Sequence, residues 1–251
     1  MNENIKKQII EALKDQKEIF GDELFEELNK RKTSVIKVSG EISPKKTDDE
    51  FGLFEEEKEG WEKAKSLDEL KNQIKDCTKC PLHKSRNKFV FGSGNPNADI
   101  MCVGEGPGAE EDKQGLPFVG RAGQLLTEIL KAIKFTRDEV YIANVIKSRP
   151  PENRTPLPSE MESCLPYLKK QIGLIKPKLI LCLGLTAAQG LLKKKETMTN
   201  LRGKLFEFES GSFQTKVMVT YHPAALLRNP NLKRDCWEDM KKFRKLYDEM
   251  K

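Results

Sequence analysis

Glycines and acids follow a short apolar run in the middle of the chain. Residues 100–103 have the composition of a buried strand, and Gly104, Gly106 and Gly108 follow, with Glu105 between the first two. Glycine allows a ligand to approach main-chain N–H groups closely, so this spacing is typical of a binding site at a strand end. The same glycines also suit a tight strand-to-helix connection without a ligand, and taken alone they leave both interpretations open.

A dinucleotide-binding loop is the obvious alternative for these glycines, and the sequence does not favour it. The third glycine comes too soon after the second, and Pro107 stands where close helix packing is needed. The acids of this stretch would also repel a pyrophosphate; they are Glu105, Glu110, Glu111 and Asp112.

Three further side chains have the chemistry to bind or polarise a ligand. Asn144 lies in an otherwise apolar strand, where its amide needs partners; it either caps a loop or reads a base edge, since it offers a donor beside an acceptor. His222, directly before Pro223, is either a satisfied core or surface group or a functional one. Phe118 is either a core residue or a stacking platform.

Cysteines supply the remaining candidate site. Cys77 and Cys80 have the spacing of half a zinc site, which alone is a weak signal. Cys102 and Cys182 lie within expected strands and Cys236 on the last helix, so we expect these three to be core residues.

The elements that must position these residues alternate along the chain. Strands are predicted over 100–103, 140–146 and 179–183, followed by a hairpin-like pair over 205–208 and 216–220. Helices are predicted near 67–74, 122–133, 158–175 and 185–192, and from 231 to the end. This alternation predicts an α/β protein with a mostly parallel sheet, whose ligands bind beyond the carboxyl ends of the strands. Glu105, Asn144 and His222 all fall at such ends.

Composition narrows the class of protein. The mean hydropathy is −0.62, 33% of the residues are charged, and no apolar run reaches the roughly 20 residues of a membrane span. The first ten residues lack the features of a secretory signal, so we expect a cytoplasmic protein with reduced cysteines.

Charge and pattern divide the chain into three predicted parts. Residues 1–35 contain two short amphipathic helices, an extension that either packs on the main body or contacts a protein partner. Residues 36–60 form an acidic linker, and residues 61–251 form the main domain, which carries a net charge of +11 while the whole chain carries +6. A basic domain favours a polyanionic partner such as DNA.

Five linked motifs in the main domain closely resemble those of the family 4 uracil-DNA glycosylases. They occur in order over about residues 67–250 and are GEGPGAEED from Gly104, GLPFVGRAG from Gly115, NVIK from Asn144, RPPENR from Arg149 and HPAALLR from His222. The resemblance implies a three-layer α/β/α fold with a central, mostly parallel four-stranded sheet. It also implies hydrolysis of the bond between uracil and deoxyribose in DNA, a base-excision step.

The resemblance assigns a role to each candidate. It implies that Phe118 stacks on uracil, that Asn144 pairs with its O4 and N3–H, and that Gly104 lines the substrate pocket. It implies that His222 and the backbone at Glu105 and Gly106 bind O2, and that Glu105 walls the pocket near C5. Better-known glycosylases carry an Asp or Asn at the position of Gly106, so Glu111 is the candidate for orienting water or for stabilising the oxocarbenium-like sugar. DNA contacts are expected from Leu226, as a wedge in the base stack, and from Arg121 and Arg228.

The resemblance also implies a 4Fe-4S cluster. Cys77, Cys80 and Cys164 match three of its four ligands, and the fourth position is Ser148. This departure leaves three outcomes open: ligation by serine oxygen, loss of one iron, or no cluster.

Two other functions remain alternatives. One is a catalytically weak protein that binds uracil-containing DNA, and the other is an iron-sulfur DNA-binding protein or redox protein. Release of uracil from a defined oligonucleotide separates the enzyme from both.

Overall fold

The computed structural model describes residues 59–211 and 213–250. The predicted N-terminal helices and nearly all of the acidic linker lie outside these residues. No helix in the described part of the chain is long and apolar enough to cross a membrane.

A six-stranded sheet forms the centre of the domain, with strand order β1-β3-β2-β4-β6-β5. Its bounds are β1 Ser93–Gly94, β2 Ile100–Gly104, β3 Tyr141–Asn144, β4 Leu179–Leu183, β5 Leu205–Ser210 and β6 Phe213–Thr220. The four central strands, β3, β2, β4 and β6, are mutually parallel, as predicted. The sheet has six strands and not four, because two antiparallel edge strands extend it. The predicted hairpin is confirmed in the pairing of β5 with β6, whereas the two-residue β1, which pairs with β3, is too short for a sequence pattern to reveal.

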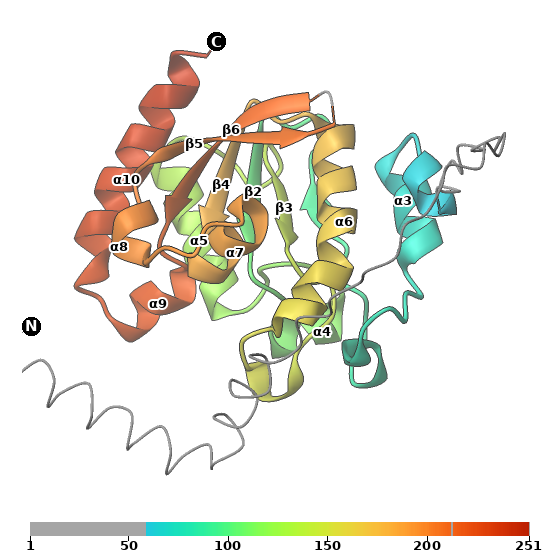
Figure 1. Cartoon of the computed structure of the whole chain (residues 1–251). Coiled ribbons are helices and arrows are strands. Elements are labelled where there is room, and N and C mark those ends of the chain that lie inside the picture. The colour runs from blue at the N-terminus through green and yellow to red at the C-terminus, as the bar shows by residue number, and fades with distance from the viewer. Residues whose placement is uncertain (1–58, 212, 251) are drawn as a thin grey trace, which may run out of the picture. The chain divides into compact units, whose positions relative to one another are not determined.

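Helices cover both faces of this sheet (Figure 1). Their bounds are α3 Leu67–Ile74, α4 Ala109–Gln114, α5 Arg121–Ala132, α6 Pro158–Ile175, α7 Leu185–Leu192, α8 Met198–Leu201, α9 Pro223–Arg228 and α10 Leu232–Asp248. Short 3₁₀ turns occur at Gly60–Lys63, Pro81–Lys84 and Pro151–Asn153. The longer helices lie close to their predicted positions, whereas the short helices α4, α8 and α9 were not predicted.

The core has two halves, one on each side of the sheet. Strand residues point alternately to opposite faces, so Met101 and Val103 pack with α3, α6 and α7, whereas Ile100 and Cys102 pack with α5 and α10. Both faces of the central strands are therefore apolar, which explains their continuous apolar runs in the sequence. The predicted three-layer α/β/α arrangement is confirmed.

Candidate active site

A cleft of about 690 Å³ lies beyond the carboxyl ends of the central strands. Segments that follow β2, β3, β4 and β6 all contribute to it. The sequence-predicted residues that line it are Glu105, Gly106, Glu111, Phe118, Asn144, His222 and Arg228. The structure therefore brings together seven candidates taken from separate motifs.

Asn144 is the last residue of β3 and is 1% exposed. Its Nδ2 and Oδ1 atoms are the two buried side-chain polar atoms of the described residues that lack a hydrogen-bond partner. Gly104, its neighbour in register on β2, makes room for it, since a Cβ there would lie 2.5 Å from Asn144 Oδ1. An unpaired buried amide costs free energy, and a ligand that pairs with it would recover that cost.

Phe118 borders the same space in a backbone conformation that side chains rarely adopt. Its φ is 52°, and its ring atoms would lie 2.6 Å from a Cβ on Gly104. Gly123 permits this loop, because a Cβ there would lie 1.9 Å from the Phe118 carbonyl oxygen. Arg137, which nothing in the sequence pattern singled out, donates to the Pro117 carbonyl. Strain held by several contacts is typical of a functional position.

Glu111 joins the two loops of the site. Its Oε1 accepts the N–H groups of Val119 and Gly120, both at 2.9 Å, and its Oε2 accepts the N–H of Gly108 at 3.1 Å. Both carboxylate oxygens thus bind backbone N–H groups. Oε2 binds the loop that carries the glycines, and Oε1 binds the loop that carries Phe118. This arrangement favours a positioning role over the water-orienting role that we expected.

His222 is held as a neutral hydrogen-bond donor. It is the N-cap of α9, and its Nδ1 accepts the N–H of Ala224 at 3.1 Å, so the ring proton of the neutral form lies on Nε2. Burial, with the charge of Arg228 as a second cause, lowers the pKa of His222 to about 4. At neutral pH the imidazole therefore offers an Nε2–H without a positive charge.

The position after Glu105 has no room for a side chain. A Cβ on Gly106 would lie 2.6 Å from Ile146 Cγ1. The carboxylate or amide that better-known glycosylases place at this point is therefore excluded sterically as well as by sequence.

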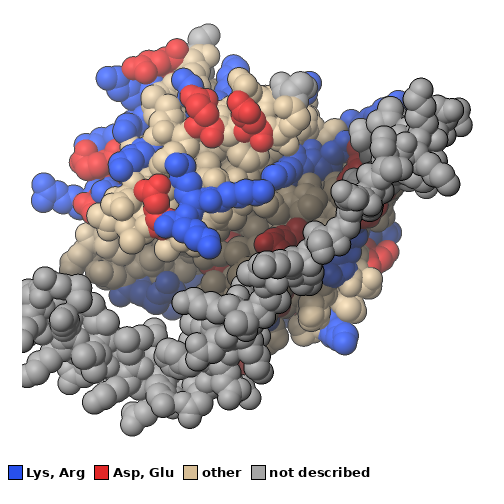
Figure 2. All heavy atoms as spheres, in the orientation of Figure 1, with Lys and Arg blue, Asp and Glu red and all other residues tan. Residues whose placement is uncertain are grey.

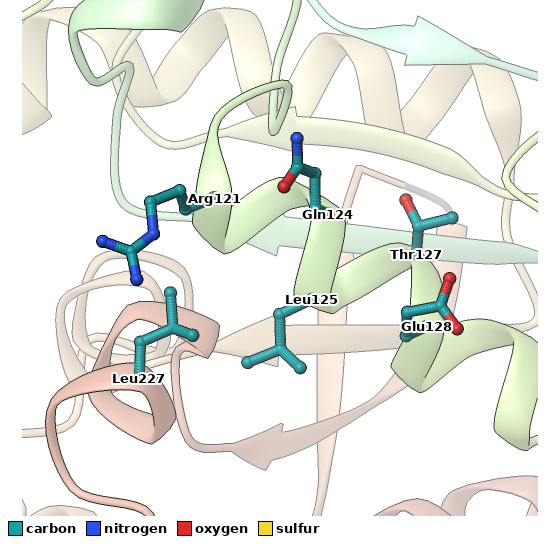
Figure 3. A pocket seen from close by; sticks show the side chains of 6 residues that line it. All are labelled: Arg121, Gln124, Leu125, Thr127, Glu128 and Leu227. Carbon is teal, nitrogen blue, oxygen red and sulfur yellow. The ribbon is translucent and has the colours of Figure 1, made fainter.

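The three expected DNA contacts divide into one buried side chain, Leu226, and two exposed ones, Arg121 and Arg228. Leu226 is 2% exposed and packs in the core with Phe118, so it cannot enter a base stack. The next residue, Leu227, is 40% exposed and faces Leu125 and Arg121 across a groove of about 410 Å³ between α5 and α9 (Figure 3). The sequence motif had pointed to Leu226. Which of the two neighbouring leucines faces solvent depends on the turn of α9, which only the structure shows.

The cysteine site lies between the 3₁₀ turn at Pro81–Lys84 and α6. Cys77 Sγ is hydrogen-bonded to the Tyr167 hydroxyl at 3.2 Å and accepts the N–H of Lys79 at 3.5 Å. Cys164 Sγ accepts the N–H of Lys147, and burial raises the pKa of this thiol to about 12. Ser148 is 5% exposed, and its Oγ accepts from Arg86 at 3.4 Å.

The other cysteines are core residues, as expected. Cys102, Cys182 and Cys236 are buried, on β2, β4 and α10. Within residues 59–211 and 213–250, no three His, Cys, Asp or Glu side chains are arranged around a single metal ion.

Comparison with known proteins gives consistent matches. The family model described as the uracil DNA glycosylase superfamily matches residues 91–241. The type-4 uracil-DNA glycosylase of Pyrobaculum aerophilum is 46% identical over 181 residues, which cover 70% of this chain and 92% of that protein. The enzyme of the same name from Archaeoglobus fulgidus is 45% identical over 185 residues (72% and 93%), and that from Thermotoga maritima 47% over 176 residues (69% and 90%). This chain therefore belongs to the uracil-DNA glycosylase superfamily, among its type-4 members.

Proposed function

We propose that this protein removes uracil from DNA by hydrolysing the bond between the base and deoxyribose, leaving an abasic site. The observation that carries the proposal is the Asn144 amide, which is buried, has no hydrogen-bond partner and belongs to the lining of the cleft. A base inside a duplex cannot reach such a cleft, so the enzyme must flip the nucleotide out of the stack.

The Asn144 amide suits uracil and opposes cytosine. Uracil presents an acceptor, O4, beside a donor, N3–H, and the amide can pair with both. Cytosine presents a donor and an acceptor in the opposite order, so an amide held with Nδ2 toward O4 and Oδ1 toward N3–H would stay unpaired against cytosine. Discrimination of this kind reaches about 10⁴. The Phe118 ring would stack on the base, and Glu105 would face C5, where thymine carries a methyl group.

The bond is broken by stabilising uracil as a leaving anion. His222 would donate Nε2–H to O2 as negative charge develops there, and the backbone N–H groups at Glu105 and Gly106 would add two further donors. A neutral donor keeps its proton on the enzyme, and no proton transfer from His222 is needed. Because Gly106 supplies no base and Glu111 is engaged with backbone, this stabilisation would provide most of the rate enhancement. Water would then attack the electron-poor sugar carbon, and the proton that it loses would neutralise the departing uracil anion.

The partner would be uracil-containing DNA. Lysine and arginine side chains are prominent on the face seen in Figure 2, in keeping with the net charge of +11 on residues 61–251. We assign the wedge role to Leu227 in place of Leu226, with Arg121 and Arg228 binding phosphates beside it.

We further propose a cysteine-ligated iron-sulfur cluster on Cys77, Cys80 and Cys164. The observation that supports the fit is a pair of backbone N–H donors, from Lys79 to Cys77 Sγ and from Lys147 to Cys164 Sγ. Such donors stabilise the thiolates that the group requires, against the burial that raises the pKa of Cys164. When bound, the cluster would tie the segment around Cys77 to α6. Ser148 occupies the fourth position, where oxygen is a poorer ligand for iron in such clusters than sulfur.

Excision from a defined oligonucleotide tests the function. Wild-type protein should convert a uracil-containing strand to an alkali-labile abasic strand, and Asn144→Asp should cut the rate by about 10² or more while leaving DNA affinity nearly unchanged. Asn97→Asp, at an exposed position, is the control. Tight binding without uracil release in the wild type would instead support the non-catalytic alternative.

A further inference from the structure

Lys147 is a fully buried lysine that the proposed chemistry does not use. It is 0% exposed and follows Asn144 by three residues. In the described part of the chain no Asp or Glu forms an ion pair with it. A buried ammonium without a carboxylate partner is costly, and among the described residues only Cys164, as a thiolate, would offset its charge.

The ammonium instead binds two neutral oxygens. Nζ donates to the main-chain carbonyl of Asn144 at 2.9 Å and to Gln171 Oε1 at 2.6 Å. Gln171, itself 0% exposed on α6, uses its Nε2 to donate to the Phe91 carbonyl at 3.0 Å. The ammonium group of Lys147 therefore links Gln171 of helix α6 to the end of β3.

With this hydrogen bond, both the N–H and the carbonyl of one peptide unit are held by the protein. The peptide that joins Asn144 to Val145 donates its N–H to the Gly104 carbonyl at 2.9 Å, and Lys147 holds its carbonyl from the other side. The Asn144 side chain has no protein hydrogen bond of its own, so the orientation of its amide depends on the backbone that carries it. Packing beside Gly104 then sets the amide position.

We propose that Lys147 is a positioning residue for the reaction, which holds the Asn144 amide ready to pair with uracil. The inference rests on the role of Asn144 proposed above. A small misplacement of a group that must meet two atoms of the substrate lowers the rate by up to about 10². Lys147 does not touch the substrate, so binding of DNA should not depend on it.

The test compares Lys147→Met with Lys178→Met. Methionine has a similar shape and removes the charge, while Lys178 is a half-exposed lysine paired with Asp99. We expect Lys147→Met to lower the single-turnover excision rate by about 10- to 100-fold and to leave the Kd for uracil-containing DNA within about twofold. Its Tm should change little, because removal of the buried charge is offset by loss of the donor to the Asn144 carbonyl and Gln171 Oε1. Lys178→Met should match the wild type.

Two outcomes would overturn the inference. A folded Lys147→Met protein with wild-type rate would do so, provided that Asn144→Asp is inactive in the same assay; if Asn144→Asp is also active, the proposed role of Asn144 fails instead. Should Lys147→Met not fold, Gln171→Leu removes the second acceptor and leaves the ammonium in place. A wild-type rate in folded Gln171→Leu would then reject the positioning role.

Discussion

The rings of Phe118 and His222 lie 5.5 Å apart, centroid to centroid, and are tilted by 33°. One ring comes from the loop before α5 and the other from the N-cap of α9, so the pair joins two motifs far apart in sequence. In the proposed function, the apolar ring of Phe118 would cover the base and the Nε2–H of His222 would meet its edge. The first prediction concerns the geometry that holds Phe118 in this place.

Gly123→Ala should displace Phe118 and thereby lower activity. The added Cβ would lie 1.9 Å from the Phe118 carbonyl oxygen, so the strained loop must move. Gly173→Ala is the control, since a Cβ there meets nothing within 4 Å and alanine is favoured over glycine in a helix by up to about 1 kcal/mol. We expect excision to fall by about 10² or more only in Gly123→Ala. Equal rates for the two variants would show that the position of Phe118 is not critical.

Glu111→Gln should lower stability and activity without moving the pH profile. The two carboxylate oxygens of Glu111 accept three backbone N–H groups. Glutamine replaces one of these oxygens with an NH2 group, which cannot accept, and a hydrogen bond lost in this way costs about 1–3 kcal/mol. Urea unfolding and excision rates measured from pH 5 to 9 check this. If the variant instead kept its stability and lost the decline of the excision rate at low pH, Glu111 would be favoured as the residue that orients water.

His222 should make the protein less stable in mild acid. Its pKa falls from the ordinary value of 6.5 to about 4 on folding, so the unfolded chain binds more protons between these values. The stability due to the neutral imidazole is thus complete above pH 6.5 and is lost as the pH falls toward 4. Unfolding free energies at pH 7 and 4.5 should differ less in His222→Gln than in the wild type. The excision rate should also show no step at pH 6.5, because the ring is already neutral there.

Leu227→Ala should affect duplex DNA more than single-stranded DNA. Leu227 is exposed, so its truncation should change stability by less than about 0.5 kcal/mol, and only a duplex has a stack to enter. Leu226→Ala should instead cost about 2–5 kcal/mol of stability, because that side chain is 2% exposed in the core. If Leu227→Ala excises uracil from duplex and single-stranded DNA at the wild-type rates, another residue is the wedge.

Several of these residues show how far the sequence alone could lead. Asn144, Phe118 and His222 were predicted because each is chemically out of place in its own segment, and parallel strands end at one edge of the sheet. Lys147, Arg137 and Gln171 were missed, since a buried lysine or arginine cannot be distinguished from a solvated one before the packing is known. Glu111 was predicted to lie in the site, and it lines the cleft, but its three backbone hydrogen bonds could not be predicted, because their donors belong to loops whose paths only the structure reveals.

Ser148→Cys should increase the iron content of the protein. A serine hydroxyl loses its proton far less readily than a thiol, and Ser148 Oγ already accepts from Arg86, so we expect the wild type, purified without oxygen, to hold fewer than four irons per chain. The variant should hold about four, with stronger visible absorption and a higher Tm, because four sulfur ligands would link the segment at Cys77 to α6. Cys236→Ala, at a buried cysteine of α10 remote from the site, controls for the loss of any thiol. Equal iron content and equal spectra for wild type and Ser148→Cys would show that position 148 does not bind iron, whereas a wild type that already holds four irons would make serine oxygen a competent ligand.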